Sequence, residues 1–243
     1  MRNGVTGRGS RPRLTLVAAR QPADVSPFWH DMAAESPEIE IHEARSSADR
    51  EKLDRFLRRV YVKDMTRNRL HADYRLQSAE DELDSGGVRL IACYRSDIVG
   101  TVRINYASKQ DLGVNADFYR MRQVAGSNHP SRTCIFSRLL VDPALRGRTL
   151  GQRLSVSAYK HALDANARTA FLLCNDQLIY YFSALGFKSY MGKTCHTEYG
   201  EVLPMKLDLL DETYLAMINS PFLGALRDWK RFRQPGVQIV PTK

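Results

Sequence analysis

The sequence predicts a mixed α/β domain in which helices pack on a sheet. Short runs rich in β-branched and aromatic residues alternate with segments that have the apolar spacing of amphipathic helices. The predicted order is helix, hairpin, strand, helix, strand, helix and further strands, which is typical of a layered α/β fold. The chain has 243 residues, of which 43% are hydrophobic, so it is long enough to bury a core of this kind.

The composition argues against a metal centre and a membrane span. The four cysteines show no C-x-x-C spacing and no histidine cluster has zinc-ligand spacing, so we predict no metal site and a reducing, cytoplasmic location. No apolar run reaches about 18 residues, and no apolar segment follows the basic N-terminus, so neither a transmembrane helix nor a secretory signal is expected. The net charge of +9 suits a nucleic acid, an anionic membrane surface or an acidic protein partner.

Residues 1–45 predict a basic, partly disordered arm, because five arginines and no acidic residues lie in residues 1–20 and glycines and prolines interrupt any period. A helix is expected from about Ser47. Apolar residues recur there on one helical face, namely Leu53, Phe56, Leu57, Val60 and Tyr61. Residues 62–87 are polar and predict a mobile segment that ends in a Gly86-Gly87 turn.

Strands and helices alternate through the rest of the chain. Residues 88–94 and 98–106 predict a hairpin, and residues 110–125 predict a short helix or a loop. Further strands are expected at 133–141, 170–174, 188–191 and 202–209. Helices are expected at 150–166, 176–184, 211–218 and 222–232, with Gly186 as the C-cap of the second of these. We therefore divide the chain into an arm (1–45), a main domain (46–222) and a C-terminal basic helix and tail (223–243).

One segment points to chemistry. The predicted strand 133–141 leads into an Arg/Gly loop that opens the helix at 150. Free backbone N–H groups and the helix dipole make such a helix start an anion site, and glycine lets the backbone approach a phosphate. The loop therefore predicts a phosphate-tailed carrier and group transfer, with an ordinary surface turn as the alternative.

Two motifs in this order resemble the GNAT acyltransferase superfamily. The family loop Arg/Gln-x-x-Gly-x-Gly/Ala is matched by Arg146-Gly147-Arg148-Thr149-Leu150-Gly151 after Val141-Asp142-Pro143. The second motif, an asparagine before a short helix that ends in Gly-Phe, is matched by Asn175 to Phe187. The resemblance implies a central twisted, mostly antiparallel sheet with a splayed strand pair and flanking helices.

Further residues resemble one branch of that superfamily. Ser137-Arg138 and Gly100-Thr101-Val102-Arg103 look like segments of acyl-homoserine-lactone synthases, as does the acidic run 80–84. Residues 196–205 resemble long-chain N-acyl amino acid synthases, and the likeness covers about residues 50–222. It implies an N-acyltransferase that moves a medium or long acyl chain from acyl carrier protein to the amine of an amino acid or a peptide side chain. The donor would be acyl-phosphopantetheine, on the carrier protein or on coenzyme A, and no cofactor would be bound permanently.

The resemblance also implies donor contacts. A backbone N–H from about Leu139 to Val141 would stabilise the oxyanion. The expected donor-binding residues are Leu139, Leu140, Val141, Arg146, Gly147, Arg148, Thr149, Leu150, Gly151 and Asn175. Asn175 has helix capping as its alternative role. Thr149 stands where the family has its middle glycine, which disfavours the pyrophosphate of coenzyme A and favours a carrier protein.

The catalytic candidates are Glu201, His196, Glu198 and Tyr181. The first three cluster within six residues. The ordinary pKa of a histidine, about 6.5, suits proton transfer. The alternative is that these residues form a solvated polar loop. Phe182 occupies the place of the family's tyrosine acid, and Ile135 that of the lactone synthases' glutamate.

The expected substrate-binding residues are Arg103, Arg138, Phe136 and Ser137. A charge in an apolar strand needs a partner, so Arg138 either contacts a substrate or forms an ion pair with Asp84 or Glu201. Apolar residues could line an acyl tunnel or simply fill the core, namely Leu83, Tyr106, Phe118, Tyr119, Met121 and Phe136.

Other interpretations remain open at this stage. One is an acetyl-CoA-dependent N-acetyltransferase for small amines, and another is a non-catalytic protein that binds an acyl carrier. Nucleic-acid binding is disfavoured because the basic residues are scattered and form no known motif. The basic C-terminal helix either contacts a membrane or carrier protein at its surface or simply packs on the domain. The oligomeric state is not predicted.

Overall fold

A sheet of eight strands organises the structure, a computed structural model that describes residues 39–67, 83–147, 149–196 and 200–233. The strand order is β1-β2-β3-β4-β5-β8-β6, and β7 pairs with β8. All pairs are antiparallel except β4–β5, which is parallel. The strands are β1 Ile39–Glu43, β2 Val88–Tyr94, β3 Asp97–Tyr106, β4 Thr133–Val141, β5 Thr169–Cys174, β6 Lys188–Ser189, β7 Thr194–His196 and β8 Gly200–Asp208.

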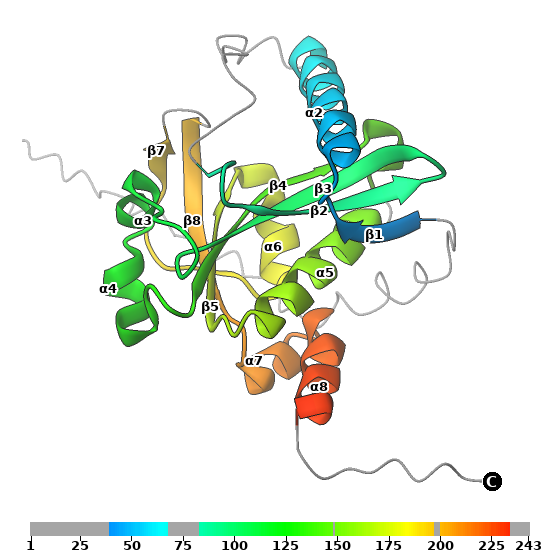
Figure 1. The fold of residues 1–243 in the computed structure, drawn as a ribbon. Coiled ribbons are helices and arrows are strands. Elements are labelled where there is room, and N and C mark those ends of the chain that lie inside the picture. The colour runs from blue at the N-terminus through cyan, green and yellow to red at the C-terminus, as the bar shows by residue number, and fades with distance from the viewer. Residues whose placement is uncertain (1–38, 68–82, 148, 197–199, 234–243) are drawn as a thin grey trace, which may run out of the picture.

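Helices cover both faces of this sheet (Figure 1). The α-helices are α2 Ser47–Arg67, α3 Val114–Phe118, α4 Met121–Ala125, α5 Leu150–Asp164, α6 Ile179–Leu185, α7 Glu212–Met217 and α8 Phe222–Arg233. Short 3-10 turns are η3 Gly126–Asn128, η4 Pro143–Leu145 and η5 Asp176–Leu178. The mixed α/β fold predicted from the sequence, with its mostly antiparallel sheet, is confirmed.

Alternation along the strands separates two apolar layers. Leu90 and Ala92 of β2 face the large core, where α5 packs, whereas Ile91 faces the cluster under α2. The apolar stripe predicted for α2 is buried here at Leu53, Phe56, Leu57 and Val60. A third cluster, beneath α3 and α4, contains Leu83, Leu112, Tyr119, Met121, Ile135 and Phe171. Because α5 and α2 lie on opposite faces, successive residues of the central strands face two different layers.

The central parallel pair separates early. β4 pairs with β5 only from Thr133–Ile135 to Thr169–Phe171, so the last six residues of β4 continue without a registered β5 partner. On its other side, β4 contains a bulge opposite β3, since Arg103 aligns with Ser137 but Thr101 aligns with Leu140. The extra residue is accommodated at Arg138, whose φ is 51°. The splayed strand pair expected from the resemblance is therefore present.

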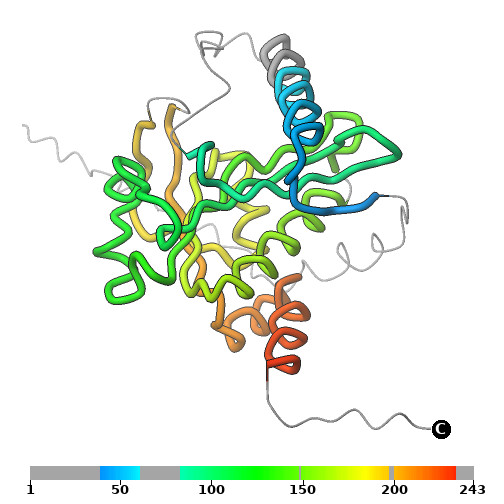
Figure 2. The backbone as a smooth tube through the Cα atoms, viewed as in Figure 1, coloured from blue at the N-terminus to red at the C-terminus, as the bar shows by residue number. Residues whose placement is uncertain are grey.

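Helices α7 and α8 belong to the same core as α5. Phe222, Ala225 and Leu226 of α8 are buried, and the Phe222 ring stacks on Tyr159 of α5 with centroids 4.3 Å apart. Figure 2 shows α8 beside α5 at the lower edge of the molecule. The boundary placed at residue 222 from the sequence therefore runs through one packed core and does not separate two packed units. The apolar face of α8 is used inside the protein, as the packed-helix interpretation requires.

Several local expectations were wrong. Residues 39–43 were placed in the disordered arm, but they form edge strand β1, paired with β2. The helix expected from Ser47 runs on to Arg67, into the segment expected to be mobile. The short strand β7 was missed. For residues 110–125, the helix alternative is the correct one, since α3 and α4 lie there. Residues 1–38 of the predicted arm lie outside the described residues. Within the described part of the chain, no helix combines the length and apolarity needed to cross a membrane.

Candidate functional site

The loop after β4 delivers the chain to the start of α5. Gly147 has a φ of 78°, a left-handed conformation that glycine adopts without strain. Thr149 is the N-cap of α5 with a φ of −70°, so the residue at this position does not have to be glycine. The Thr149 side chain forms no capping hydrogen bond. The first turn of α5, at Leu150 and Gly151, has the backbone N–H groups and the dipole that any helix start presents.

Two arginines hold this loop in place. Arg59 of α2 donates from Nη2 to Asp142 Oδ2 and to the carbonyl of Ile98, both at 3.2 Å. Asp142 Oδ1 in turn accepts from the Ala144 N–H at 3.0 Å and so caps η4. Arg146 donates from Nε to the carbonyl of Val141 at 3.2 Å while its side chain remains exposed. Arg148 lies outside the described residues.

The end of β4 presents a backbone N–H toward the splay. The Asp142 N–H donates to Val99 O, so the next aligned pair, Val141 with Gly100, is a non-hydrogen-bonded pair of the ladder. Val141 therefore directs its N–H and C=O away from β3, toward the side from which β5 has diverged. Leu140, one residue earlier, pairs with Thr101 and directs its backbone N–H and C=O toward β3.

Tyr181 lies at the same helix start. Its hydroxyl is 3.0 Å from Ser155 Oγ, and Ser155 donates to the carbonyl of Gly151 at 3.0 Å. A Cβ added to Gly151 would come within 3.4 Å of the Tyr181 hydroxyl, so the ring packs directly on the first turn of α5. Burial raises the pKa of Tyr181 to about 12, despite the hydrogen bond with Ser155. The phenol therefore stays protonated at neutral pH.

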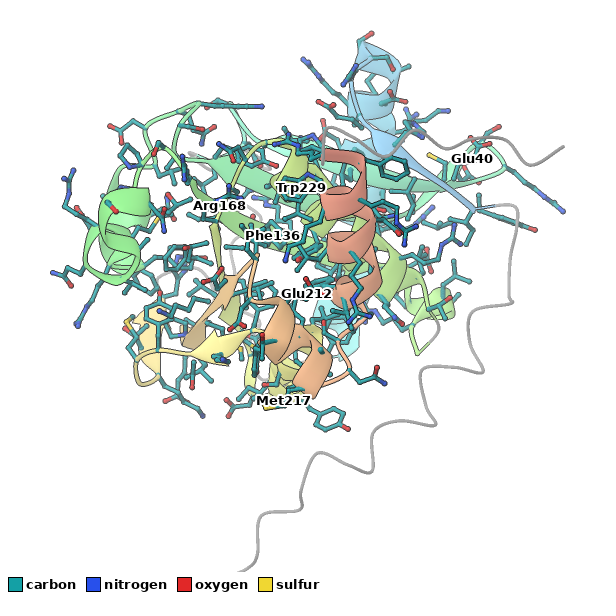
Figure 3. The ribbon with its side chains drawn as sticks, turned by 90° about the horizontal axis from the view of Figure 1, so that it is seen from below. Glu40, Phe136, Arg168, Glu212, Met217 and Trp229 are labelled. Carbon is teal, nitrogen blue, oxygen red and sulfur yellow. The ribbon has the colours of Figure 1, made fainter. Side chains whose placement is uncertain are left out.

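Aromatic rings fill the interior beside the splay. Phe136 of β4 lies 6.1 Å from Phe187, and Phe182 lies 6.0 Å from Phe187, centroid to centroid. Phe136 is labelled near the centre of the molecule in Figure 3. Phe182, at the position of the family's tyrosine acid, is buried in this group. The apolar residues considered for an acyl tunnel divide between two clusters. Phe136 and Tyr106 belong to the large core, whereas Leu83, Phe118, Tyr119 and Met121 belong to the cluster beneath α3 and α4.

Asn175 follows β5 at its carboxyl end. Its side chain is exposed and forms no cap hydrogen bond with η5, so the capping alternative is wrong. The residue stands at the same edge of the sheet as the loop after β4, because β4 and β5 are parallel.

The face of the sheet opposite α5 holds a group of charged side chains, most of them buried, which we name the Asp84 cluster (Asp84, Arg89, Arg103 and Arg138). The Asp84 carboxylate forms ion pairs with all three arginines: with Arg103, with Arg89 at 2.9 Å and with Arg138 at 3.5 Å. The side chains of Asp84, Arg103 and Arg138 are 4%, 2% and 9% exposed. Of the two ion-pair partners considered for Arg138, Asp84 is the correct one.

Neighbouring polar groups complete this cluster. Arg103 Nε donates to Ser137 Oγ at 3.0 Å, which links β3 to β4. Asn105 Nδ2 donates to the carbonyl of Leu83 at 2.5 Å and so holds the segment that carries Asp84. Three of the four predicted substrate-binding residues, Arg103, Ser137 and Arg138, are thus brought together, while Phe136 faces the opposite side.

Of the acidic or basic candidates near β7 and β8, His196 and Glu201 have different surroundings. The His196 ring is half-buried and packs edge-to-face on Phe118 of α3, with centroids 5.0 Å apart. Glu201 is 69% exposed, and its carboxylate accepts from Lys193 Nζ at 3.1 Å. Lys193 also donates to Asp176 at 2.6 Å, and these two carboxylates raise its pKa. Glu198 lies outside the described residues.

Two site residues were missed from the sequence. Ser155 lies four residues after Gly151, so helical spacing alone places it beneath the loop's last glycine. Lys193 had no such signal, because its partners come from β8 and the turn after β5. Within the described residues, no group of three or more histidine, cysteine or acidic side chains is arranged to hold a metal.

Comparison with protein families gives one match over most of this structure. The model of a family described as N-acyl amino acid synthase FeeM matches residues 53–208, which run from α2 to the end of β8. Among curated proteins, no sequence matches the chain.

Solved structures share the fold at low sequence identity. FeeM, an N-acyl amino acid synthase from uncultured soil microbes, superposes with a TM-score of 0.56 at 12% identity, covering 78% of this chain and 98% of that one. BjaI, a CoA-dependent acyl-homoserine lactone synthase, gives 0.54 at 16% identity, covering 80% and 99%. MesI, also a CoA-dependent acyl-homoserine lactone synthase, gives 0.52 at 16% identity, covering 83% and 97%.

Proposed function

The chain belongs to the N-acyl amino acid synthase FeeM family and is an acyltransferase, and from this premise we propose that it transfers a medium or long acyl chain from acyl carrier protein to the amine of an amino acid. The observation that carries the proposal is the splay of β4 from β5 beside the glycine-bearing start of α5. This arrangement supports a thioester arm whose phosphate binds the helix start and whose reacting carbon lies between the strands.

The proposed donor contacts follow the carboxyl edge of the sheet. The phosphate would bind at Gly147, Thr149, Leu150 and Gly151, with Arg146 and Arg148 as side-chain partners. The exposed Asn175 would bind the amides of the pantetheine arm. The N–H groups of Leu139 and Val141 are our candidates for the oxyanion site, and the direction of the Val141 backbone supports this role.

In the proposed reaction, the neutral amine attacks the thioester carbonyl carbon. A tetrahedral oxyanion forms, the C–S bond breaks, and the leaving thiolate takes up a proton while the nitrogen loses one to a base. The half-buried His196 is the stronger candidate for that base, because Glu201 is exposed and engaged by Lys193. Tyr181 is assigned to the donor site rather than to acid catalysis, since a thiolate leaves without a strong acid.

A carrier protein is the proposed donor. Its arm carries one phosphate, whereas in coenzyme A that phosphate is part of a pyrophosphate that leads to a nucleotide, for which Thr149 leaves less room than the family's glycine. The net charge of +9 also suits an acidic carrier protein.

Purified protein tests this proposal directly. It should be incubated with acyl carrier proteins of several chain lengths, with the matching acyl-CoA thioesters and with acetyl-CoA, each in the presence of an amino-acid pool. Mass spectrometry should detect an N-acyl amino acid with the long-chain carrier-protein donor. Product from acetyl-CoA alone would indicate a small-molecule acetyltransferase, and no acylated amine with any donor would overturn the proposal.

A further inference from the structure

Helices α7 and α8 lie at the edge of the sheet opposite to the proposed donor site. Helix α7 follows the end of β8, which is antiparallel to β5 and therefore ends beside Thr169, where β5 begins. Asn175 and the loop after β4 lie at the other edge, at the carboxyl ends of β4 and β5. In Figures 1 and 2, α8 lies at the lower edge with its C-terminal end directed away from the sheet. The proposed reaction does not use this end of the molecule.

The core occupies one face of α8, and the last turn of the helix extends beyond the core. Phe222, Ala225 and Leu226 are buried, and Trp229 packs partly buried against the same core. Three residues later, Phe232 continues this apolar stripe but is 81% exposed. A single exposed apolar side chain is ordinary on a protein surface. What Phe232 can bind is therefore decided by the groups around it.

Basic side chains surround Phe232. Lys230, Arg231 and Arg233 share the last turn of α8 with it, and this turn contains no acidic residue. Arg227 lies one turn earlier, so four cations fall within seven residues. The Arg231 side chain is 69% exposed, and that of Arg227 is more than half exposed. A group of this size and density is typical of segments that are attracted to anionic lipid surfaces.

Acidic residues compensate the part of α8 that faces α7. Glu212 accepts hydrogen bonds from Arg227 Nε at 3.0 Å and from Lys230 Nζ at 2.7 Å. A groove of about 500 Å³ lies between the two helices here, and Asp211, the N-cap of α7, also lines it. Figure 3 views this end of the molecule and labels Glu212 and Trp229. The groove is therefore close to neutral, and the excess of positive charge lies nearer the end of α8.

The end of α8 is less compensated. Asp228 lies 3.9 Å from Arg231, and because both side chains are more than half exposed, this ion pair contributes little. Arg233 lies over the ring of Trp229, with its guanidinium carbon 4.7 Å from the centroid, a contact that leaves its charge in place. Phe232 thus stands between two arginines at a protruding helix end. Such a ring can enter the headgroup layer of a membrane while the arginines contact phosphates.

We propose that the α8 end, defined as Arg227, Lys230, Arg231, Phe232 and Arg233, docks the protein on an anionic lipid membrane. Charge complementarity selects this partner, since a membrane of anionic lipids has a negative potential that acts within about 10 Å at about 0.1 M salt. The apolar face of α8 stays in the core, so the helix end contacts the membrane surface and the helix does not insert. The donor edge, at the opposite side of the sheet, stays open to its partner.

Vesicle binding by the full-length protein tests this inference without donor or acceptor, so it can fail while the proposed function holds. Co-sedimentation should be compared for vesicles of phosphatidylcholine alone and vesicles that also contain about 30% phosphatidylserine. The protein should bind the phosphatidylserine vesicles at least about tenfold more tightly at low salt. Raising NaCl from about 50 mM to about 500 mM should abolish most of this preference. Equal binding to both vesicles, or none, would overturn the proposal.

A double variant assigns the binding to the α8 end. Arg231→Gln/Phe232→Ser should lower the affinity for phosphatidylserine vesicles about 20-fold, of which the arginine accounts for about fivefold. The matched control, Arg58→Gln/Val114→Ser, removes an exposed arginine from α2 and an exposed apolar residue from α3. It should change this affinity less than about twofold. Melting curves of both variants check folding. Equal losses in the two variants would indicate attraction by overall charge and would overturn the assignment.

Other sources of vesicle binding give different outcomes. The N-terminal arm is also basic, so Arg11→Gln/Arg13→Gln should be compared with the α8 variant. If the arm variant lost vesicle binding and the α8 variant kept it, the membrane contact would belong to the arm and the proposal would be wrong. If the α8 variant instead weakened binding to an acyl carrier protein, or dissociated a dimer, with vesicle binding unchanged, the α8 end would be a protein interface. That result would also overturn the membrane proposal.

Discussion

Tyr181 and Ser155 connect the two helices on the donor side of the sheet, with their hydroxyl oxygens 3.0 Å apart. Because Ser155 also donates to the Gly151 carbonyl, this contact ties α6 to the first turn of α5. The geometry of the proposed phosphate site therefore depends on a side chain that precedes the family's usual tyrosine position by one residue.

Tyr181→Phe should weaken donor binding without altering the chemical step. A neutral hydrogen bond contributes about 1 kcal/mol, so the KM for the donor should rise about fivefold and kcat should change little. With its pKa at about 12, Tyr181 does not titrate between pH 6 and pH 9, so the pH profile of kcat in that range should not change. Steady-state kinetics over that range measure both quantities.

The adjacent residue is the control for this experiment. Tyr180 is 66% exposed, so Tyr180→Phe should have no effect on donor KM. Ser155→Ala should raise the donor KM about as much as Tyr181→Phe does. The double variant should lose less donor-binding free energy than the sum of the two single variants, since both remove the same contact. A collapse of kcat in Tyr181→Phe at constant KM would instead indicate an acid role for the phenol.

Gly147→Ala should weaken the proposed phosphate loop through backbone strain alone. No heavy atom outside its chain neighbours lies within 4 Å of the added Cβ, but the φ of 78° costs a non-glycine residue about 1–2 kcal/mol. We expect the donor KM to rise about fivefold or more and the melting temperature to fall by a few degrees. Gly224→Ala in α8 also meets open space and should instead raise stability by about 0.5–1 kcal/mol. If Gly147→Ala and Gly224→Ala both lowered the melting temperature, this account would be contradicted.

His196 and Glu201 should differ in their importance to catalysis. His196→Ala should lower kcat by about 100-fold or more, the usual contribution of a general base, with donor affinity unchanged. Glu201→Gln should lower kcat by less than about threefold, because the carboxylate is exposed and engaged by Lys193. Single-turnover rates with saturating donor would check the difference. The opposite order would transfer the proposed base to Glu201.

Local patterns predicted most of the fold. The stripe from Leu53 to Val60 identified α2, and the apolar run before the Arg/Gly loop identified β4 with the observed bounds. Edge strand β1 was missed although Ile39 and Ile41 alternate with polar residues, because five residues after a proline-rich segment are a weak signal. Strand β7 has three residues and exists through its pairing with β8, which no local pattern reports.

The candidate site was predictable only in part. The glycine loop is contiguous, so its motif could be identified directly. The Asp84 cluster gathers side chains from β2, β3, β4 and the turn before them, and its geometry depends on a bulge at Arg138 that has no sequence marker. The sequence therefore left Asp84 and Glu201 as alternative partners of Arg138, and only tertiary structure distinguished them.

Asp142 should matter more as a cap than as an ion-pair partner. Its Oδ1 accepts from the Ala144 N–H, whereas its Oδ2 pairs with Arg59, whose side chain is 44% exposed. An exposed ion pair contributes about 0–1 kcal/mol and a lost cap about 1 kcal/mol. Asp142→Ala removes both and should raise the donor KM about fivefold or more, while Asp142→Asn keeps the cap acceptor and should raise it less than about threefold. Arg59→Ala should raise the donor KM by about as much as Asp142→Asn does. If all three variants raised the donor KM equally, the ion pair between α2 and the loop, rather than the cap, would be what positions the donor.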